Sequence, residues 1–271
     1  MTPLRQKYGQ TIIYILLLVA VIIIMAGTRR CDRGMTLPAI TQGDSRGDTI
    51  DVGIVYGPMS YYVYNDTLGG LNLDMLNAMK NGLGRPVRLW PVVSLHDALR
   101  RLEKGNFDML ASLPSDNSIK QRFLTSRSVF LDRLVLIQLA DTNGEKKVKS
   151  ALDLGNDTVY IPKESPAAAR LANLSNEIGT QIPIAQRDDL SEEYLCMMVG
   201  SGKIPLAVVN EKTARSMQKE YPRLSFDSPV SFTQFQVWLF ARGDTALRTS
   251  VDRWLDDYQS TPAYKELIRR Y

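Results

Sequence analysis

Histidine and cysteine are scarce in this chain of 271 residues, which has one of the first and two of the second. The cysteines, Cys31 and Cys196, form neither a C-x-x-C pair nor a zinc-type spacing. The histidine, His96, falls in a capping-box pattern at residues 94–97 and is predicted to be a surface helix residue. A Ser-His-Asp site would need it in a cleft. A Gly-x-Ser-x-Gly pattern occurs at residues 43–47, but it lies in a polar segment and not at a strand-to-helix turn, and a Gly-rich phosphate loop is missing. The sequence therefore predicts no enzyme, no cofactor and no metal site.

Excess charge is also missing from most of the chain. Four of the 33 basic residues and none of the 29 acidic ones lie in residues 1–30, so the remainder carries 29 of each sign. A neutral domain lacks the electrostatic footprint of a nucleic-acid binder. We therefore expect no nucleic-acid partner.

One long apolar run stands near the amino terminus. It carries no charge, and about 20 apolar residues in a helix are enough to span a bilayer core. We predict a transmembrane anchor at residues 11–28, after a cytoplasmic amino terminus at residues 1–10 and before a polar linker at residues 29–48. A cleaved signal peptide is the alternative, although its apolar core is usually shorter. Basic residues flank both ends of the run, so the positive-inside rule does not decide its orientation.

The two cysteines are assigned separately. Cys196 lies in an apolar segment at residues 194–199, which predicts a buried free thiol. Cys31 follows Arg29 and Arg30 instead of small residues, which argues against lipidation there. A disulfide between the two stays open, but no feature of the sequence favours it.

Beyond the linker, short apolar runs alternate with amphipathic stretches, which is typical of an α/β fold. Predicted strands cover residues 51–56, 87–92, 107–111, 134–138, 158–161, 182–184, 206–209 and 235–240. Predicted helices cover residues 70–83 and 94–103, follow Ser165-Pro166, run from residues 189–192 to Gly200, cover 211–220, and follow Asp244 and Ser260.

A polar, turn-rich segment at residues 141–147 is predicted to cross between two lobes. We place lobe 1 at residues 49–140, lobe 2 at 141–228, and a return to lobe 1 at 229–271. A chain that leaves a lobe and returns to it makes a cleft with a hinge, and ligands of open α/β sheets bind in such clefts.

Five segments from residue 51 onward, about four-fifths of the chain, carry a family resemblance. They are residues 57–62 (Gly-Pro-Met-Ser-Tyr-Tyr), 69–76 (Gly-Gly-Leu-Asn-Leu-Asp-Met-Leu), 102–110 (Leu-Glu-Lys-Gly-Asn-Phe-Asp-Met-Leu), 221–224 and 237–239. In order and spacing they resemble the bacterial extracellular solute-binding proteins of family 3, which have a two-lobed type-II periplasmic-binding fold. Within that superfamily the chain looks most like the binding module of the membrane-bound lytic murein transglycosylases F. The resemblance implies a periplasmic domain with the amino terminus inside the cell.

The departures from the family pattern concern the residues that hold the ligand. In amino-acid-binding members a Thr and a following Arg grip the ligand carboxylate, whereas these positions read Pro114 and Ile119 here. The Asp that takes the ammonium is Asn210, and the Gly before the lobe-two helix is Glu164. Each lost charge-assisted bond is worth roughly 1.5–3 kcal/mol. The usual zwitterion clamp is therefore predicted to be absent, so that the ligand differs or the cleft binds weakly.

Candidate ligand-binding residues follow the first strand, the third strand, and the lobe-two strands: Ser60, Tyr61, Tyr62, Ser112, Ser165 and Asn210. The tyrosines offer an aromatic shelf or core packing. Ser165 offers a hydroxyl and free N–H groups at a helix start, or a simple N-cap. Lys120 or Arg122 could replace the missing arginine, or be exposed helix charges.

We therefore expect a membrane-tethered, non-catalytic binding module for an amino-acid-like or peptidoglycan-derived solute, acting in sensing, regulation or delivery. Two alternatives remain: an interaction protein whose degenerate cleft docks envelope machinery, and the receptor of an ABC importer. The catalytic part of the transglycosylases would need well over a hundred residues after Tyr271, so we do not expect cell-wall cleavage.

Overall fold

The computed structural model describes residues 17–19, 48–64, 67–114 and 116–271. The globular part belongs to one compact unit that ends at Tyr271. The predicted cytoplasmic terminus and most of the predicted anchor and linker lie outside the described residues. Within the described residues, no helix combines the length and the apolarity needed to cross a bilayer.

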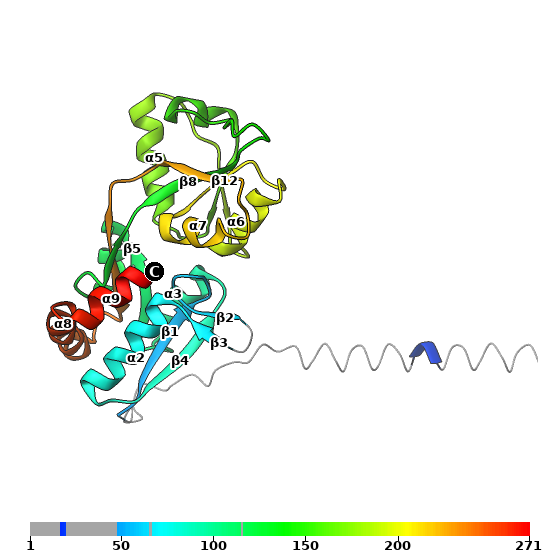
Figure 1. The fold of residues 1–271 in the computed structure, drawn as a ribbon. Helices are drawn as coiled ribbons and strands as arrows, with labels where there is room; N and C mark the ends of the chain where they lie inside the picture. The colour runs from blue at the N-terminus through cyan, green and yellow to red at the C-terminus, as the bar shows by residue number, and fades with distance from the viewer. Residues whose placement is uncertain (1–16, 20–47, 65–66, 115) are drawn as a thin grey trace, which may run out of the picture. The chain divides into compact units, whose positions relative to one another are not determined.

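The first lobe is built on a mixed sheet in the order β4-β1-β5-β13-β6, with β7 also paired to β13 (Figure 1). Its strands are β1 (Ile50–Val55), β4 (Val87–Val92), β5 (Met109–Pro114), β6 (Leu124–Thr125), β7 (Phe130–Asp132) and β13 (Gln234–Phe240). Strands β1, β4 and β5 are parallel, and β13 runs antiparallel to β5. Because the parallel strands are joined by helices, the carboxyl ends of β1 and β4 reach the same edge of the sheet.

Helices cover both faces of this sheet. They are α2 (Leu71–Leu83), α3 (Leu95–Glu103), α4 (Asn117–Arg122), α8 (Thr245–Gln259) and α9 (Pro262–Arg270). Helices α2, α8 and α9 pack together around one core, in which Trp238 is fully buried and lies parallel to Trp254 at 6.1 Å. A short hairpin of β2 (Tyr62–Tyr64) and β3 (Thr67–Gly69) precedes α2.

The second lobe has a five-stranded sheet in the order β10-β9-β11-β8-β12. Its elements are β8 (Leu134–Leu139), η1 (Ala151–Asn156), β9 (Val159–Pro162), α5 (Ala167–Ile178), β10 (Ile184–Arg187), α6 (Glu192–Gly200), β11 (Leu206–Asn210), α7 (Glu211–Met217) and β12 (Leu224–Pro229). Alternate residues of β8 pack into two cores, one with α5 and the other with α6 and α7. Cys196 lies in the second of these cores, fully buried with a free thiol, as predicted.

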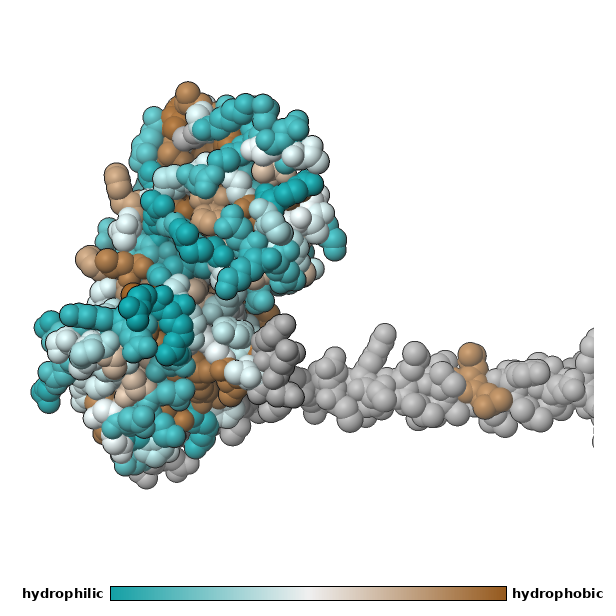
Figure 2. Space-filling view, in the orientation of Figure 1, coloured by the Kyte–Doolittle hydropathy of each residue, from teal (hydrophilic) through white to brown (hydrophobic). Residues whose placement is uncertain are grey.

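The crossing between the lobes differs from the prediction. Residues 134–138 were assigned to lobe 1 and residues 141–147 to the crossing, but β8 pairs with β11 and β12 and therefore belongs to lobe 2. The chain crosses at Arg133, between β7 and β8, and returns at residues 230–233, between β12 and β13. A strand that is apolar except for Gln138, such as β8, shows no alternation that could tell which sheet it joins. Figure 2 shows hydrophobic atoms beside these joining segments, in agreement with the exposed rings of Phe232 and Phe235.

Candidate functional site

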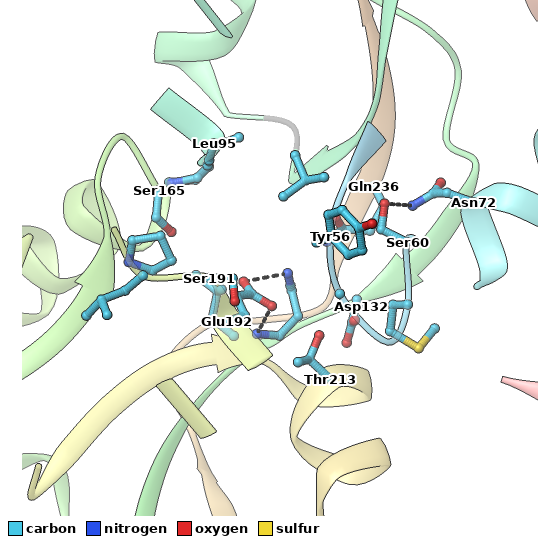
Figure 3. A pocket seen from close by; sticks show the side chains of 18 of the residues that line it. Tyr56, Ser60, Asn72, Leu95, Asp132, Ser165, Ser191, Glu192, Thr213 and Gln236 are labelled. Atoms are coloured by element: carbon cyan, nitrogen blue, oxygen red, sulfur yellow. Dashed lines mark hydrogen bonds between the residues drawn. The ribbon is translucent and has the colours of Figure 1, made fainter. Parts of the chain in front are cut away.

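A cavity of about 110 Å³ lies between the two lobes (Figure 3). Lobe 1 lines it with Val55, Tyr56, Gly57, Met59, Ser60, Asn72, Val93, Leu95, Phe130, Asp132 and Gln236. Lobe 2 lines it with Leu134, Pro162, Ser165, Pro166, Leu190, Ser191, Glu192, Asn210 and Thr213. A space of this size holds several water molecules or a small organic molecule.

The cavity sits at the carboxyl ends of parallel strands from both sheets. Val55 ends β1 and Val93 follows β4, while Pro162 ends β9 and Asn210 ends β11. Such edges hold ligands because side chains from several turns converge there while the strands stay rigid. The cleft predicted from the order of strands is thus present in the structure.

The turn after β1 gives the cavity one of its walls. Residues 57–61 fold back on themselves, with the N–H groups of Ser60 and Tyr61 both donating to the Gly57 carbonyl at 3.0 Å. The turn is then fixed to α2, because Asn72 N donates to Met59 O at 3.2 Å and Leu73 N to Ser60 O at 3.1 Å. The Ser60 side chain is thereby held at the cavity.

Of the six predicted ligand-binding residues, Ser60, Ser165 and Asn210 line the cavity. Ser165 is 7% exposed, and its Oγ accepts a hydrogen bond from Ala167 N at 3.3 Å, as a residue at a helix start does. Ser112 lies in β5, but its side chain is outside the described part of the structure.

The two predicted tyrosines do not line the cavity, and the preceding tyrosine does. Tyr56 faces the cavity, while Tyr61 packs edge-on against it with ring centroids 5.2 Å apart and also contacts the lobe-one core. Tyr62 faces a separate groove that contains the carboxyl-terminal Tyr271. The tight turn at residues 57–61 reverses the chain after β1. Position in the sequence therefore pointed to Tyr61 and Tyr62 as the aromatic residues of the site, whereas the structure places Tyr56 there.

Glu192 is a site residue that the sequence did not single out. Its two carboxylate oxygens accept hydrogen bonds from Asn210, one from the backbone N at 3.2 Å and one from Nδ2 at 3.0 Å. Burial raises the pKa of Glu192 to about 7, and nearby Asp132 adds to the rise, against the hydrogen bonds from Asn210 and Thr213. The sequence assigned Glu192 to the start of a helix, and α6 does begin there. That assignment gave no indication that Glu192 lines the cavity.

Asp132 is the second carboxylate at the cavity, and the sequence did not single it out either. It is 6% exposed, and its Oδ1 accepts hydrogen bonds from Arg133 N at 2.8 Å and Lys212 N at 3.3 Å. Burial raises the pKa of Asp132 to about 6, although both backbone hydrogen bonds oppose the shift. The end of β7, where the chain crosses between the lobes, puts this side chain in the cleft.

Two buried polar atoms at the cavity have no hydrogen-bond partner among the described residues. One is the Oδ1 acceptor of Asn210, and the other is the Nε2 donor of Gln236, a side chain that is 2% exposed. A buried polar atom left without a partner costs about 1–3 kcal/mol. Both side chains line the cavity, where an N–H or O–H donor would satisfy Asn210 and an acceptor would satisfy Gln236. Across the described residues, no group of three or more His, Cys, Asp or Glu is placed to hold a metal ion.

A bridge joins the lobes at the rim of the cleft, and we call its three residues His96, Arg122 and Glu164 the rim bridge. His96 Nδ1 lies 2.6 Å from Glu164 Oε1, and Arg122 Nη1 donates to Glu164 Oε2 at 2.7 Å. Burial alone would raise the pKa of Glu164, but the hydrogen bonds from Arg122 and His96 hold it below its ordinary value. Glu164 has a positive φ of 62°, which fits a position where the family has glycine.

The positions of these residues revise the expectation for His96 and decide between the two alternatives for Lys120 and Arg122. His96 is not a surface residue of its helix, because its side chain is only 18% exposed in the bridge. Arg122 pairs with Glu164 and Glu103 and does not line the cavity, so it does not take the place of the missing arginine. Lys120 is exposed on α4, and Ile119, at the position of that arginine, is 2% exposed.

We expect Glu164→Ala to shift the domain toward open forms, because it removes both bonds of the rim bridge and leaves the Ser94–Asp188 hydrogen bond between the lobes. Partly buried, charge-assisted contacts of this kind are worth about 1–2 kcal/mol. Spin labels on exposed Arg100 of α3 and Asn176 of α5 should report longer and broader distances in pulsed electron resonance. Glu177→Ala, which breaks an ion pair with Arg170 within lobe 2, is the matched control. Identical distance distributions in both variants would show that the rim bridge does not hold the lobes.

Two sheets, two crossings and a cavity between the sheets that is mainly apolar with a few polar side chains define a two-lobed solute-binding domain of the type-II periplasmic class. Residues 49–271 match the model of bacterial extracellular solute-binding proteins, family 3, and the chain belongs to this family.

The chain also has a distant sequence similarity to a longer curated protein. The membrane-bound lytic murein transglycosylase F of Aeromonas hydrophila is 27% identical over 225 residues, which cover 82% of this chain but only 44% of that protein. The chain thus spans less than half the length of this relative.

Solved structures share the fold. An ancestral arginine-binding protein bound to arginine superposes with a TM-score of 0.71 at 17% identity, covering 83% of this chain and 98% of that one. A histidine kinase sensor domain with similarity to periplasmic binding proteins gives a TM-score of 0.70 at 15% identity, covering 82% and 95%. At such identities the likeness establishes the two-lobed fold alone.

Proposed function

We propose that this protein is a non-catalytic binding module that closes over a small, amino-acid-like solute at the outer face of the bacterial inner membrane. The apolar run at residues 11–28 tethers it there, with the domain in the periplasm. Ligand binding biases the hinge toward the closed form, and the closed domain signals to, regulates or delivers to a membrane or envelope partner.

The observation that carries the proposal is the cavity itself. It lies at the carboxyl ends of both sheets, is bounded by both lobes, and contains the unpartnered polar atoms of Asn210 and Gln236. A purely structural interface between lobes would bury its polar groups in pairs. A site that binds a solute keeps such groups for the ligand, and membership of a solute-binding family agrees with this use.

A thermal-shift screen of the full chain in detergent micelles tests the proposal. A library of amino acids, amines, amino-acid derivatives and muropeptides should contain compounds that raise the melting temperature. By linkage, a ligand at a hundred times its Kd adds about 2.7 kcal/mol to the stability of the folded state. If no member of the library shifts the melting temperature, the binding function is excluded and a docking role for a closed domain takes its place.

A further inference from the structure

The cavity carries negative charge and no balancing positive charge. Asp132 and Glu192, which we call the carboxylate pair, both line it, and no lysine, arginine or histidine stands among its described lining residues. The side chains of residues 112–115 are not described, but their sequence, Ser-Leu-Pro-Ser, adds no basic group. A ligand carboxylate placed in this cavity would therefore meet two carboxyl groups and no basic side chain in the described lining, and like charges at short range are repelled.

The basic residues near the cavity face elsewhere. Arg122 is held at the rim by Glu164 and Glu103. Arg133 Nε pairs with Glu211. Lys212 donates its backbone N–H to Asp132 and its charge also acts on that carboxyl group, but the residue lines the groove around Tyr271 and not the cavity. None of these three side chains lines the cavity, so none is placed to grip an anionic group of a ligand there.

The two unpartnered atoms indicate which hydrogen-bonding groups a ligand needs. Asn210 Oδ1 needs a donor, and Asn210 is hydrogen-bonded to Glu192, so this acceptor lies beside the carboxylate pair. Gln236 Nε2 needs an acceptor, and Gln236 comes from lobe 1, where Figure 3 places it near Tyr56 and Ser60. An ammonium group fits the first position, because it has three donors and a positive charge. A neutral carbonyl or hydroxyl oxygen fits the second.

The remaining walls set the size and polarity of the ligand. They are mainly apolar, with side chains from both lobes: Val55, Met59, Val93, Leu95, Phe130 and Leu190. The ring of Tyr56 adds an aromatic face, which attracts cations. A space of about 110 Å³ admits a molecule of only a few non-hydrogen atoms beyond the ammonium group.

We infer that the cavity selects a small primary ammonium ion whose carboxylate is absent or blocked, with its ammonium at the carboxylate pair and Asn210 and a neutral oxygen at Gln236. Amides of amino acids and short amino alcohols belong to this class. The inference rests on the proposed solute-binding function and names its ligand chemistry. It also accounts for the altered clamp positions, since a ligand without a carboxylate needs no arginine in place of Ile119.

Isothermal titration calorimetry on the full chain in detergent micelles tests this with compounds that share one side chain. L-Alaninamide is a cation, L-alanine a zwitterion and N-acetyl-L-alanine an anion. We expect L-alaninamide to bind at least tenfold more tightly than L-alanine, and N-acetyl-L-alanine to give no heat of binding. Glycinamide and ethanolamine, as smaller members of the class, should also bind.

Variants identify the charged groups responsible. Glu192→Gln and Asp132→Asn keep the size of each side chain and should each weaken L-alaninamide binding at least tenfold. Glu193→Gln is the matched control, because Glu193 follows Glu192 in sequence but lines the groove around Tyr271 instead of the cavity. Melting curves establish that each variant is folded before titration. If the two cavity variants bind L-alaninamide as tightly as the Glu193→Gln control, the carboxylate pair is not the ammonium site and the inference is wrong.

The outcomes of these experiments distinguish an error in the ligand class from an error in the proposed solute-binding function. If L-alanine binds as tightly as L-alaninamide, or if only anionic or zwitterionic compounds of the broad screen bind, the ligand class is overturned while the solute-binding function stands. If no compound of any class binds, the solute-binding function itself is wrong.

Discussion

The melting temperature of the full chain is expected to fall as the pH rises from 5 to 8. Burial raises the pKa of Glu192 to about 7 and that of Asp132 to about 6, above the values of 4.5 and 3.8 that these groups have in the unfolded chain. The folded state therefore holds more protons than the unfolded state across this range, and its stability is lost as the pH rises through the raised pKa values.

The size of the effect is large for single side chains. The shift of Glu192 corresponds to roughly 3 kcal/mol, and each kcal/mol moves the melting temperature of a domain of this size by about 2–4 °C. Carboxylates with a lowered pKa, such as Glu211 beside Arg133, act with the opposite sign, but only below about pH 4.5. The raised groups therefore govern the range from pH 5 to 8.

Glu192→Gln should flatten this dependence and leave the protein more stable than wild type at pH 8. The new amide can be accommodated, because Asn210 can turn its side-chain amide and offer the now unpartnered Oδ1 as an acceptor. Glu177→Gln is the control, since Arg170 holds the pKa of Glu177 below its ordinary value, outside the tested range. Melting curves of the variants at half-unit pH steps measure the slopes. A Glu192→Gln slope equal to that of wild type would mean that Glu192 is charged throughout.

The second large effect is expected from Gly70→Ala, just before α2. Gly70 has a φ of 131°, which side chains rarely adopt, and an added Cβ would lie 2.2 Å from the backbone oxygen of Ser60. That oxygen also accepts the hydrogen bond from Leu73 N that fixes the turn after β1. The substitution must therefore move the turn or the helix, and we expect a loss of more than about 3 kcal/mol of unfolding free energy.

Gly84→Ala separates the steric clash from backbone strain. Gly84 ends α2 with a φ of 61°, but no atom lies within 4 Å of the added Cβ. Its loss should be about 1–2 kcal/mol, the cost of the left-handed conformation alone. Urea denaturation followed by tryptophan fluorescence gives both values. Equal losses in the two variants would show that the turn accommodates the new methyl group.

The order of most of the longer strands and helices could be predicted because it depends on short-range patterns, whereas β2, β3, β6, β7, β12 and α4 were not predicted. The apolar run of β1, the helical spacing in α2 and the glycine that ends it all lie within a few residues of one another. The two-lobed organisation was predicted from the pattern of elements and from the family resemblance, and the match of residues 49–271 agrees with it. The assignment of β8 to lobe 1 was wrong because strand pairing is decided by partners far along the chain, β11 and β12.

The candidate site could be predicted only in part, because local sequence patterns reveal some of its residues and not others. Ser60, Ser165 and Asn210 lie at or after the carboxyl ends of β1, β9 and β11, which are parallel strands of the two mixed sheets, so the rule that such ends line the cleft located them. Glu192 stands at a helix start and Gln236 within a strand, and no local sequence pattern indicates that either residue lines the cavity. The one histidine and Arg122 likewise gave no sign that they meet Glu164 across the rim.

The sequence by itself determined that the globular part is an α/β domain of balanced charge without the usual amino-acid clamp residues. Only the tertiary structure decided which polar groups line the cavity, among them the carboxylate pair and the two amide side chains of Asn210 and Gln236. The physical reason is that local patterns record which residues lie on one face of a strand or helix. The charge and hydrogen-bonding of a cavity depend on side chains from both lobes, which come together only when the sheets close over one another.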